Sequence, residues 1–179
     1  IGHEVAGEVI NVGSKVKDFK IGDRVAVWID SNGYSEEVVA GADRIFKISS
    51  NISFEEALAE PIGCTTNGIL KTNIQLGDKV VLVGTGFMGL LLIQQIKLQG
   101  ASLIVAVDLR DDMLEIASQL GADATINPSK ENVIDRINEL TDNKKVDVSF
   151  EIGGNQSTLN LAADICRMEG KLVIFGYHP

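Results

Sequence analysis

A glycine-rich turn between two apolar runs is the clearest chemical signal in this sequence. The first run covers residues 79–83, and the second covers residues 103–107 and ends at Asp108. Glycines at the first, third and sixth positions of the turn, followed by a helical pattern, form the G-x-G-x-x-G arrangement that binds the pyrophosphate of a dinucleotide. The residues expected to contact the cofactor here are Gly84, Thr85, Gly86, Phe87, Met88 and Gly89.

The residue types in and after this turn each have a physical role. Gly84 permits the tight turn, and Gly86 lets backbone N–H groups approach the phosphates. Gly89 allows the following helix to pack close to the strand, and the N-terminus of that helix favours negative charge. Asp108 can accept hydrogen bonds from both ribose hydroxyls of an adenosine and would repel a 2′-phosphate, which favours NAD over NADP. Arg110 could stack on adenine, indicate NADP or be a solvated charge.

A second group of residues has the side chains that bind zinc. His3 and Glu4 are neighbours near the start of an expected strand, and Glu60 and Cys64 lie close together around Pro61. Imidazole, carboxylate and thiolate are all zinc ligands, and a catalytic zinc takes three protein ligands with one open position. Taken alone, a histidine beside a carboxylate is more often a structural pair, and Cys64 is equally compatible with a small buried thiol.

Two regions of different texture must position these residues, and the first extends to about residue 50. Its short β-rich runs are separated by glycine-containing turns, which predicts a small antiparallel sheet or partial barrel. The expected strands cover residues 5–12, 24–29, 34–39 and 44–48. Ser53 and Glu56 then form a capping-box pattern that predicts the start of a helix. Pro61 should interrupt that helix, and residues 65–71 should form the helix that leads into the next domain.

From residue 79 onward, strands and helices alternate, which predicts an α/β fold with a parallel sheet and right-handed crossovers. The expected strands are 79–83, 103–107, 124–126, 146–151 and 171–176, and the expected helices are about 87–99, 112–120, 131–141 and 156–168. These are five of the six strands of a Rossmann sheet. We assign residues 1–60 to a β-rich domain and residues 61–179 to the nucleotide-binding domain.

The composition narrows the class of protein. Hydrophobic residues make up 45% of the chain and charged residues 23%, the balance of a globular α/β protein. A net charge of −9 argues against nucleic acid or an anionic membrane as a partner. Two cysteines, Cys64 and Cys166, cannot form a disulfide framework and fit a reducing, cytoplasmic location. Cys166, on the apolar side of its helix, is expected to be a buried thiol.

The motifs together resemble the zinc-dependent medium-chain alcohol and polyol dehydrogenases. The resemblance covers essentially the whole sequence and rests on the run from Gly2 to Val9 (Gly-His-Glu-Val-Ala-Gly-Glu-Val), on Val12-Gly13, on Gly-Asp-Arg-Val at residues 22–25, on Glu60-Pro61 and on the nucleotide motif. It implies a Rossmann domain preceded by part of a GroES-like catalytic domain. The implied reaction transfers hydride from a secondary alcohol or polyol to NAD. Glu60-Pro61 is typical of the sorbitol and threonine dehydrogenase branch.

The resemblance also implies roles for individual residues at a catalytic zinc. His3 matches the zinc-binding histidine of the family, and Glu4 or Glu60 matches a carboxylate that binds the metal or supports it. Cys64 falls where the alcohol dehydrogenase branch has a cysteine ligand, so whether Glu60 or Cys64 completes the zinc shell stays open. The four-cysteine lobe that holds a structural zinc in many members is missing between residues 25 and 34. We therefore expect a single zinc per subunit.

Two further expectations concern the last residues. Phe175 and Gly176 fall where the backbone of the family contacts the nicotinamide. His178 lies either near the mouth of the active site or in an ordinary surface loop.

The family's first zinc-binding cysteine and the nearby proton-relay hydroxyls have no counterpart here, and both ends of the sequence look cut. We therefore expect an internal segment that does not turn over alone, taken from a homodimer or homotetramer that acts on a small alcohol. Two rival functions use the same fold. A zinc-free, NADPH-dependent quinone or enone reductase would not need His3, Glu4 or Glu60 and would usually lack an acid at position 108. A non-catalytic nucleotide-binding protein would bind the cofactor without zinc or turnover.

Overall fold

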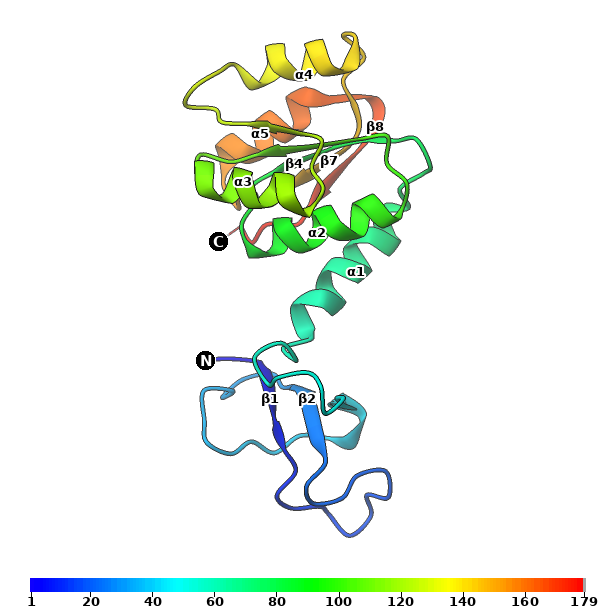
Figure 1. The fold of residues 1–179 in the computed structure, drawn as a ribbon, viewed down its shortest axis with the longest axis vertical. Coiled ribbons are helices and arrows are strands. Elements are labelled where there is room, and N and C mark those ends of the chain that lie inside the picture. The colour runs from blue at the N-terminus through cyan, green and yellow to red at the C-terminus, as the bar shows by residue number, and fades with distance from the viewer. Residues whose placement is uncertain (179) are drawn as a thin grey trace. The chain divides into compact units, whose positions relative to one another are not determined.

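The computed structural model describes residues 1–178 and divides the chain into two compact units. The first comprises Ile1–Gly63, and the second begins at Cys64. Each unit has its own sheet, and their elements can be followed by colour in Figure 1. No helix within residues 1–178 is both long enough and apolar enough to cross a membrane.

The first unit contains a small antiparallel sheet. Its strands are β1 (Glu4–Glu8), β2 (Arg24–Trp28) and β3 (Ile45–Lys47), the last preceded by a short 3₁₀ helix, η1 (Ala42–Arg44). The strand order is β1-β2-β3, so β2 is central and its Val25 and Val27 are buried at 4% and 9% exposure. Val5, Val9 and Val38 pack against this core, among other partly buried side chains. The expected small β-rich sheet is therefore present.

Two local expectations in this unit were wrong. Residues 34–39 form no strand, because Tyr34 and Val39 are exposed and only Val38 of the apolar side chains in that run contacts the core. The capping box at Ser53 and Glu56 does form, with reciprocal bonds of 2.9 and 3.1 Å, yet it closes only one turn.

Pro61 explains why that turn does not continue as a helix. Its missing N–H and its ring are incompatible with a helix running through it from Ser53, but both are tolerated in a first turn. The long helix α1 (Glu60–Thr72) accordingly starts at Glu60, five residues earlier than expected. This early start places Glu60 at the helix N-terminus.

The second unit is a five-stranded parallel sheet with helices on both faces. The strands are β4 (Lys79–Val83), β5 (Leu103–Val107), β6 (Ala124–Ile126), β7 (Val146–Glu151) and β8 (Cys166–Ile174), in the order β6-β5-β4-β7-β8. The helices after α1 are α2 (Phe87–Leu98), α3 (Asp111–Leu120), α4 (Val133–Thr141) and α5 (Gln156–Ile165). The predicted Rossmann-type sheet is confirmed, with five parallel strands.

Alternate residues of the strands feed two separate cores, as expected for a sheet covered on both faces. Val80 and Leu82 pack with residues of α2 and α3, whereas Val81 and Val83 pack with residues of α4 and α5. Figure 1 shows these two helix pairs on opposite sides of the sheet. All four residues are between 0% and 2% exposed, so the strands are rigidly held. They can therefore fix the position of the residues that follow their carboxyl ends.

The end of α5 differs from expectation. The predicted helix ran to residue 168, but α5 stops at Ile165 and β8 begins at Cys166, which pairs with Val146. The strand then shifts register so that Val148 pairs with Lys171. Arg167 donates to Asp147 at 2.7 Å and holds the extra residues against β7, where a helix could not continue. Cys166 is consequently only partly buried and lies in a strand, not on a helix face as expected.

Candidate metal and nucleotide sites

Three side chains of the first unit meet as a candidate metal site. His3 directly precedes β1, Glu4 opens that strand, and Glu60 opens α1. His3 Nε2 lies 3.6 Å from Glu4 Oε1 and 3.9 Å from Glu60 Oε2. One ligand atom from each side chain falls within 4.8 Å of the others. Residues that are 56 positions apart in sequence are thus brought together because Pro61 sets the start of α1.

The donor set suits zinc. Ligand atoms placed about 2.0–2.2 Å from a tetrahedral zinc would be separated from one another by roughly 3.4 Å, close to the two distances from His3. A neutral imidazole and two carboxylates would balance the charge of a divalent ion. The side chains of His3, Glu4 and Glu60 are 51%, 32% and 21% exposed, so an ion and a further ligand have access.

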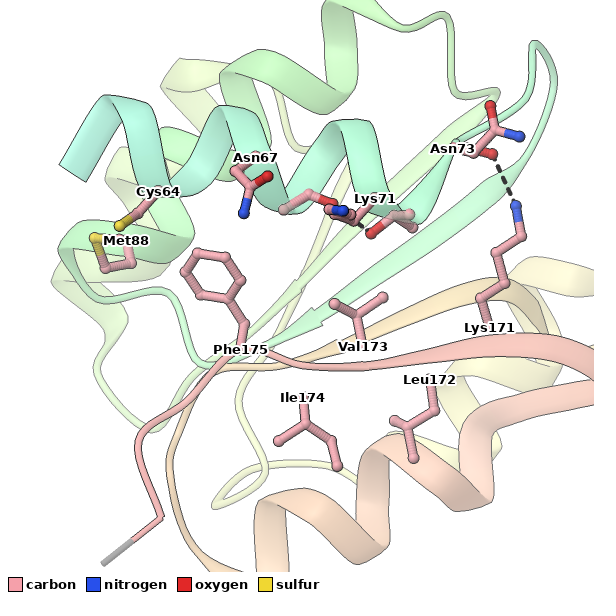
Figure 2. Close-up of a pocket in the computed structure, with 12 residues that line it drawn as sticks. Cys64, Asn67, Lys71, Asn73, Met88, Lys171, Leu172, Val173, Ile174 and Phe175 are labelled. Atoms are coloured by element: carbon pink, nitrogen blue, oxygen red, sulfur yellow. Dashed lines mark hydrogen bonds between the residues drawn. The ribbon is translucent and has the colours of Figure 1, made fainter. Parts of the chain in front are cut away.

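Cys64 follows Glu60 by four residues on α1 and is exposed, so of its two interpretations the small buried thiol was wrong. Figure 2 shows its sulfur beside that of Met88, which lies in the first turn of α2. Both line a cavity of about 840 Å³ that runs between α1 and β8 within the second unit. The structure gathers His3 and Glu4 with Glu60, and it places Cys64 on the wall of this cavity.

The glycine-rich turn between β4 and α2 has the backbone geometry that its sequence predicts. Gly84 has a φ of +106°, a conformation that side chains other than glycine rarely adopt. A Cβ on Gly84 would also lie 3.0 Å from Gly153 N. A Cβ on Gly89 would lie 2.5 Å from Gly84 O, so the absence of a side chain lets α2 pack directly on the turn. The turn and helix therefore form one tightly packed unit.

The N-terminus of α2 is open to an anion. Gly86 is its N-cap and provides no side-chain hydrogen bond, and the first turn carries no acidic residue. The first N–H groups of a helix have no partner within it, and together with the helix dipole they favour a phosphate. Thr85 is fully buried, yet its hydroxyl has no hydrogen-bond partner among residues 1–178. Buried hydroxyls are normally paired, so this orphan next to Gly86 fits a site that a ligand completes.

Asp108 follows β5 and is held in place by the glycine turn. Its carboxylate accepts the backbone N–H of Thr85 at 2.8 Å and that of Arg110 at 3.0 Å, and Arg110 Nε donates to the same carboxylate at 3.1 Å. Burial alone would raise the pKa of Asp108. The hydrogen bonds from Arg110 and Thr85 outweigh that effect and keep the pKa below its usual value. Asp108 is therefore an oriented carboxylate that is ionised at neutral pH.

Phe175 and Gly176 follow β8 at the other side of the glycine turn. The Phe175 ring packs towards α1, where Gly68 leaves room for it: a Cβ there would lie 2.7 Å from the ring (Figure 2). The N–H groups of Phe175 and Gly176 both donate to Glu151 O, at 2.8 and 2.9 Å. The backbone at this position is thereby fixed to the end of β7.

A buried cluster that sequence reasoning missed lies beneath this segment. Glu151, the last residue of β7, has a side chain that is 0% exposed. It accepts hydrogen bonds from Thr158 Oγ1 at 2.6 Å and Gly154 N at 2.7 Å, and it pairs with His178 Nε2 at 2.7 Å. His178 is an exposed loop residue, as one of its two interpretations predicted, and its side chain, which is 31% exposed, is bound to a buried acid. The acid at the end of β7 was the available signal in the sequence, although the strand also contains Asp147 and Ser149.

Comparison with known proteins shows the family of the chain. The family model for the alcohol dehydrogenase GroES-like domain matches residues 1–73, and that for zinc-binding dehydrogenases matches residues 88–179, just over half of the chain. The chain belongs to the zinc-binding dehydrogenase family. This confirms the resemblance drawn from the Gly-His-Glu and Glu60-Pro61 motifs, including the GroES-like assignment of the first part.

Individual relatives give the same picture. The chain is 33% identical to a sorbitol dehydrogenase from Bacillus subtilis over 98% of its own length and 58% of that protein. It superimposes on an Escherichia coli oxidoreductase/dehydrogenase of unknown specificity with a TM-score of 0.92 at 28% identity, covering all of this chain and 60% of the other. A zinc-binding dehydrogenase from Sinorhizobium meliloti, solved bound to NADP, gives a TM-score of 0.91 at 26% identity and the coverages 100% and 61%. The chain thus spans about three fifths of the length of these relatives.

Proposed function

We propose that this chain is part of a zinc-dependent dehydrogenase that transfers hydride from a secondary alcohol or polyol to NAD. The observation that carries the proposal is the convergence of His3, Glu4 and Glu60 within 4.8 Å. A zinc-free reductase of the same fold would have no use for an imidazole and two carboxylates at one point. The name of the sorbitol dehydrogenase relative supports a polyol over a simple alcohol.

At the metal, the residues of this chain act mainly by position and charge. Zinc bound there would act as a Lewis acid on the substrate hydroxyl and lower the pKa of that group. His3 is presented by the start of β1 and would coordinate through Nε2, the ring nitrogen that faces both carboxylates. Glu4 lies in a strand and Glu60 at a helix end, so both carboxylates are held by regular backbone. We assign zinc binding to His3 with Glu4 or Glu60.

At the nucleotide, the chain would hold the dinucleotide along the carboxyl edge of the sheet. The open N-terminus of α2 and the backbone of residues 84–89 would receive the pyrophosphate. Asp108 would accept the hydroxyls of the adenosine ribose, which favours NAD over NADP. Arg110 introduces a competing charge, because its guanidinium lies beside Asp108 and within reach of Gly86. We propose that Asp108 decides the preference, although one structural relative was solved with NADP.

The partners follow from the same chemistry. The substrate would be a small neutral alcohol, and a chain with a net charge of −9 has no electrostatic attraction for nucleic acid or anionic lipid. We also propose a cytoplasmic homodimer or homotetramer with one zinc per subunit. Size-exclusion chromatography with light scattering on the intact protein would measure the number of subunits.

The function can be tested on the intact protein by removing and restoring the metal. NADH formation would be followed with a panel of polyols and secondary alcohols before chelation, after chelation, and after zinc is added back. The proposal requires activity that disappears with the metal and returns with it. Quinone reduction by NADPH that is insensitive to chelation would indicate the zinc-free reductase. NADH binding without zinc and without turnover of any substrate would indicate a nucleotide-binding protein.

A further inference from the structure

We propose that Glu151 and His178 form a latch that positions the nicotinamide end of the bound cofactor. The proposal rests on the proposed dinucleotide function and adds two positioning residues to it. Neither residue is part of the glycine motif or of the metal group. Both hold the backbone of residues 175–178, the segment that follows β8.

The topology of the sheet places this latch at the cofactor. In the strand order β6-β5-β4-β7-β8, the chain proceeds outward from β4 on one side through β5 and on the other through β7. A ligand binds at such a switch point, beyond the carboxyl ends of the strands. Glu151 pairs directly with Val83, the last residue of β4 before the glycine turn. With Asp108 marking the adenosine side over β5, the nicotinamide half must extend over β7 and β8.

The backbone after β8 is packed too closely around Glu151 to move independently of it. A Cβ on Gly176 would lie 2.6 Å from Gly154 N and 2.8 Å from Glu151 Oε2. A Cβ on Gly154 would lie 2.5 Å from Tyr177 O. Glycine at both positions lets two stretches of backbone touch, and His178 then closes the contact through its bond to Glu151. The segment 175–178 is therefore fastened at Glu151 by both backbone and side chain.

The hydrogen bonds of the cluster fit a charged acceptor at its centre. Thr158 Oγ1 and Gly154 N both donate to the Oε1 atom of Glu151, and His178 Nε2 contacts Oε2. Burial would raise the pKa of Glu151, but the bonds from Thr158, His178 and Gly154 outweigh burial and lower it. The ionised carboxylate can only accept, so His178 must carry a proton on Nε2. Within residues 1–178, the side chains that bond to Glu151 are those of Thr158 and His178.

A comparison of two ligands separates positioning from general damage. NADH contains the nicotinamide and ADP-ribose lacks it, while both share the adenosine and pyrophosphate. For His178→Ala we expect the dissociation constant of NADH to rise about 10-fold and that of ADP-ribose to change by less than about twofold, the scale of losing one hydrogen bond to a charged group. His178→Gln, whose amide N–H can still donate to Glu151, should recover most of the NADH affinity. Isothermal titration of the intact wild type and both variants measures these dissociation constants.

Lys171→Ala is the matched control. Lys171 begins the continuously paired stretch 171–174 of β8 and donates to Asn73 O at 2.7 Å, so its loss removes an anchor of β8 without touching the latch. Its ratio of NADH to ADP-ribose affinity should equal that of the wild type. Unchanged NADH affinity in His178→Ala, or an equal loss of both ligands, would overturn the latch and leave the dinucleotide site standing. A wild type that binds neither ligand would overturn the proposed function, and the latch with it.

Discussion

Asp108 is the residue on which cofactor choice depends in this account. Its carboxylate is anchored by Thr85 on the glycine turn and is also engaged by Arg110. The two side chains have opposite effects on the preference between NAD and NADP. The acid favours the free ribose diol of NAD, and the guanidinium favours the 2′-phosphate of NADP. The sequence predicted both residues at the site. It could not predict that they bond to each other, because that depends on the orientation of the Arg110 side chain.

Removing the acid should therefore shift the preference towards NADP. In Asp108→Ala the guanidinium of Arg110 loses its partner, and the ratio of kcat/KM for NAD to that for NADP should fall by about 10-fold or more. In Arg110→Ala the same ratio should rise, since the carboxylate is retained without its competitor. Steady-state kinetics with both cofactors measures the change. A wild-type preference for NADP, or a ratio unaffected by Asp108→Ala, would refute the assignment.

Glu60 and Cys64 offer a second choice at the residue scale, namely which one completes the zinc shell. Glu60 lies 3.9 Å from His3, whereas Cys64 lines the cavity beside Met88. We expect Glu60→Ala to lower kcat/KM by about 10–100-fold, the scale of losing a ligand or its supporting partner. Cys64→Ser should retain zinc and most activity. Zinc lost in Cys64→Ser but kept in Glu60→Ala would give the metal site a cysteine ligand and weaken the case for a polyol.

At the scale of elements, the predictions from sequence were correct where the apolar side chains of the segment are buried. The five strands of the parallel sheet were predicted because continuous apolar runs such as Val80–Val83 are buried on both faces. The strand expected at residues 34–39 failed because most of its apolar side chains are exposed. The capping box at Ser53 was predicted correctly, but the helix expected to follow it was not, because Pro61 imposes a new helix start. The end of α5 depends on pairing between β7 and β8, which no local pattern encodes.

Helix α2 provides the test at this scale, because its contact with the glycine turn has no spare room. A Cβ on Gly89 would lie 2.5 Å from the backbone oxygen of Gly84, so Gly89→Ala must push the helix away from the turn. We expect a loss of about 1–3 kcal/mol in the free energy of unfolding, the usual scale of overpacking. NADH binding should weaken as well, because the N–H groups at the start of α2 move. Thermal unfolding and NADH titration measure the two effects.

Gly63 supplies a matched control for Gly89. It lies in helix α1, and a Cβ at this position would meet nothing within 4 Å. Gly63→Ala should leave the stability unchanged or raise it by up to about 1 kcal/mol, since alanine is the better helix former. If Gly89→Ala behaved like Gly63→Ala, the close packing of α2 on the turn would not be needed for the fold.

For the whole molecule, the hydrogen-bonded carboxylates of Asp147, which is partly buried, and Glu151, which is fully buried, determine how the free energy of unfolding changes in acid. Asp147 accepts from Lys79 N and Arg167 Nε at 2.8 and 2.7 Å, and Glu151 is held by its own cluster. In each case burial opposes ionisation, but the hydrogen bonds dominate and lower the pKa in the folded state. Unfolding therefore takes up protons in acid, so the stability that these groups provide at neutral pH is lost as pH falls.

This predicts a free energy of unfolding that decreases below the ordinary carboxyl pKa values of 3.8 and 4.5 and continues to fall towards the lowered folded-state values. Denaturant unfolding between pH 7 and pH 3 measures the slope. Asp147→Asn, which cannot ionise, should be less stable at neutral pH and should show a shallower decline in acid. A stability that stays constant or rises over this range would contradict the assignment of these carboxylates.

The candidate metal site of His3, Glu4 and Glu60 is the central claim. It separates a zinc-dependent dehydrogenase from every rival that shares the nucleotide-binding fold. Metal analysis of the intact protein by plasma mass spectrometry, in the wild type and in His3→Ala, tests it most directly. The account predicts one zinc per subunit in the wild type and loss of that zinc in His3→Ala, while NADH binding by the second unit is retained. Two zinc ions per subunit, no zinc in the wild type, or zinc fully retained in His3→Ala would contradict it.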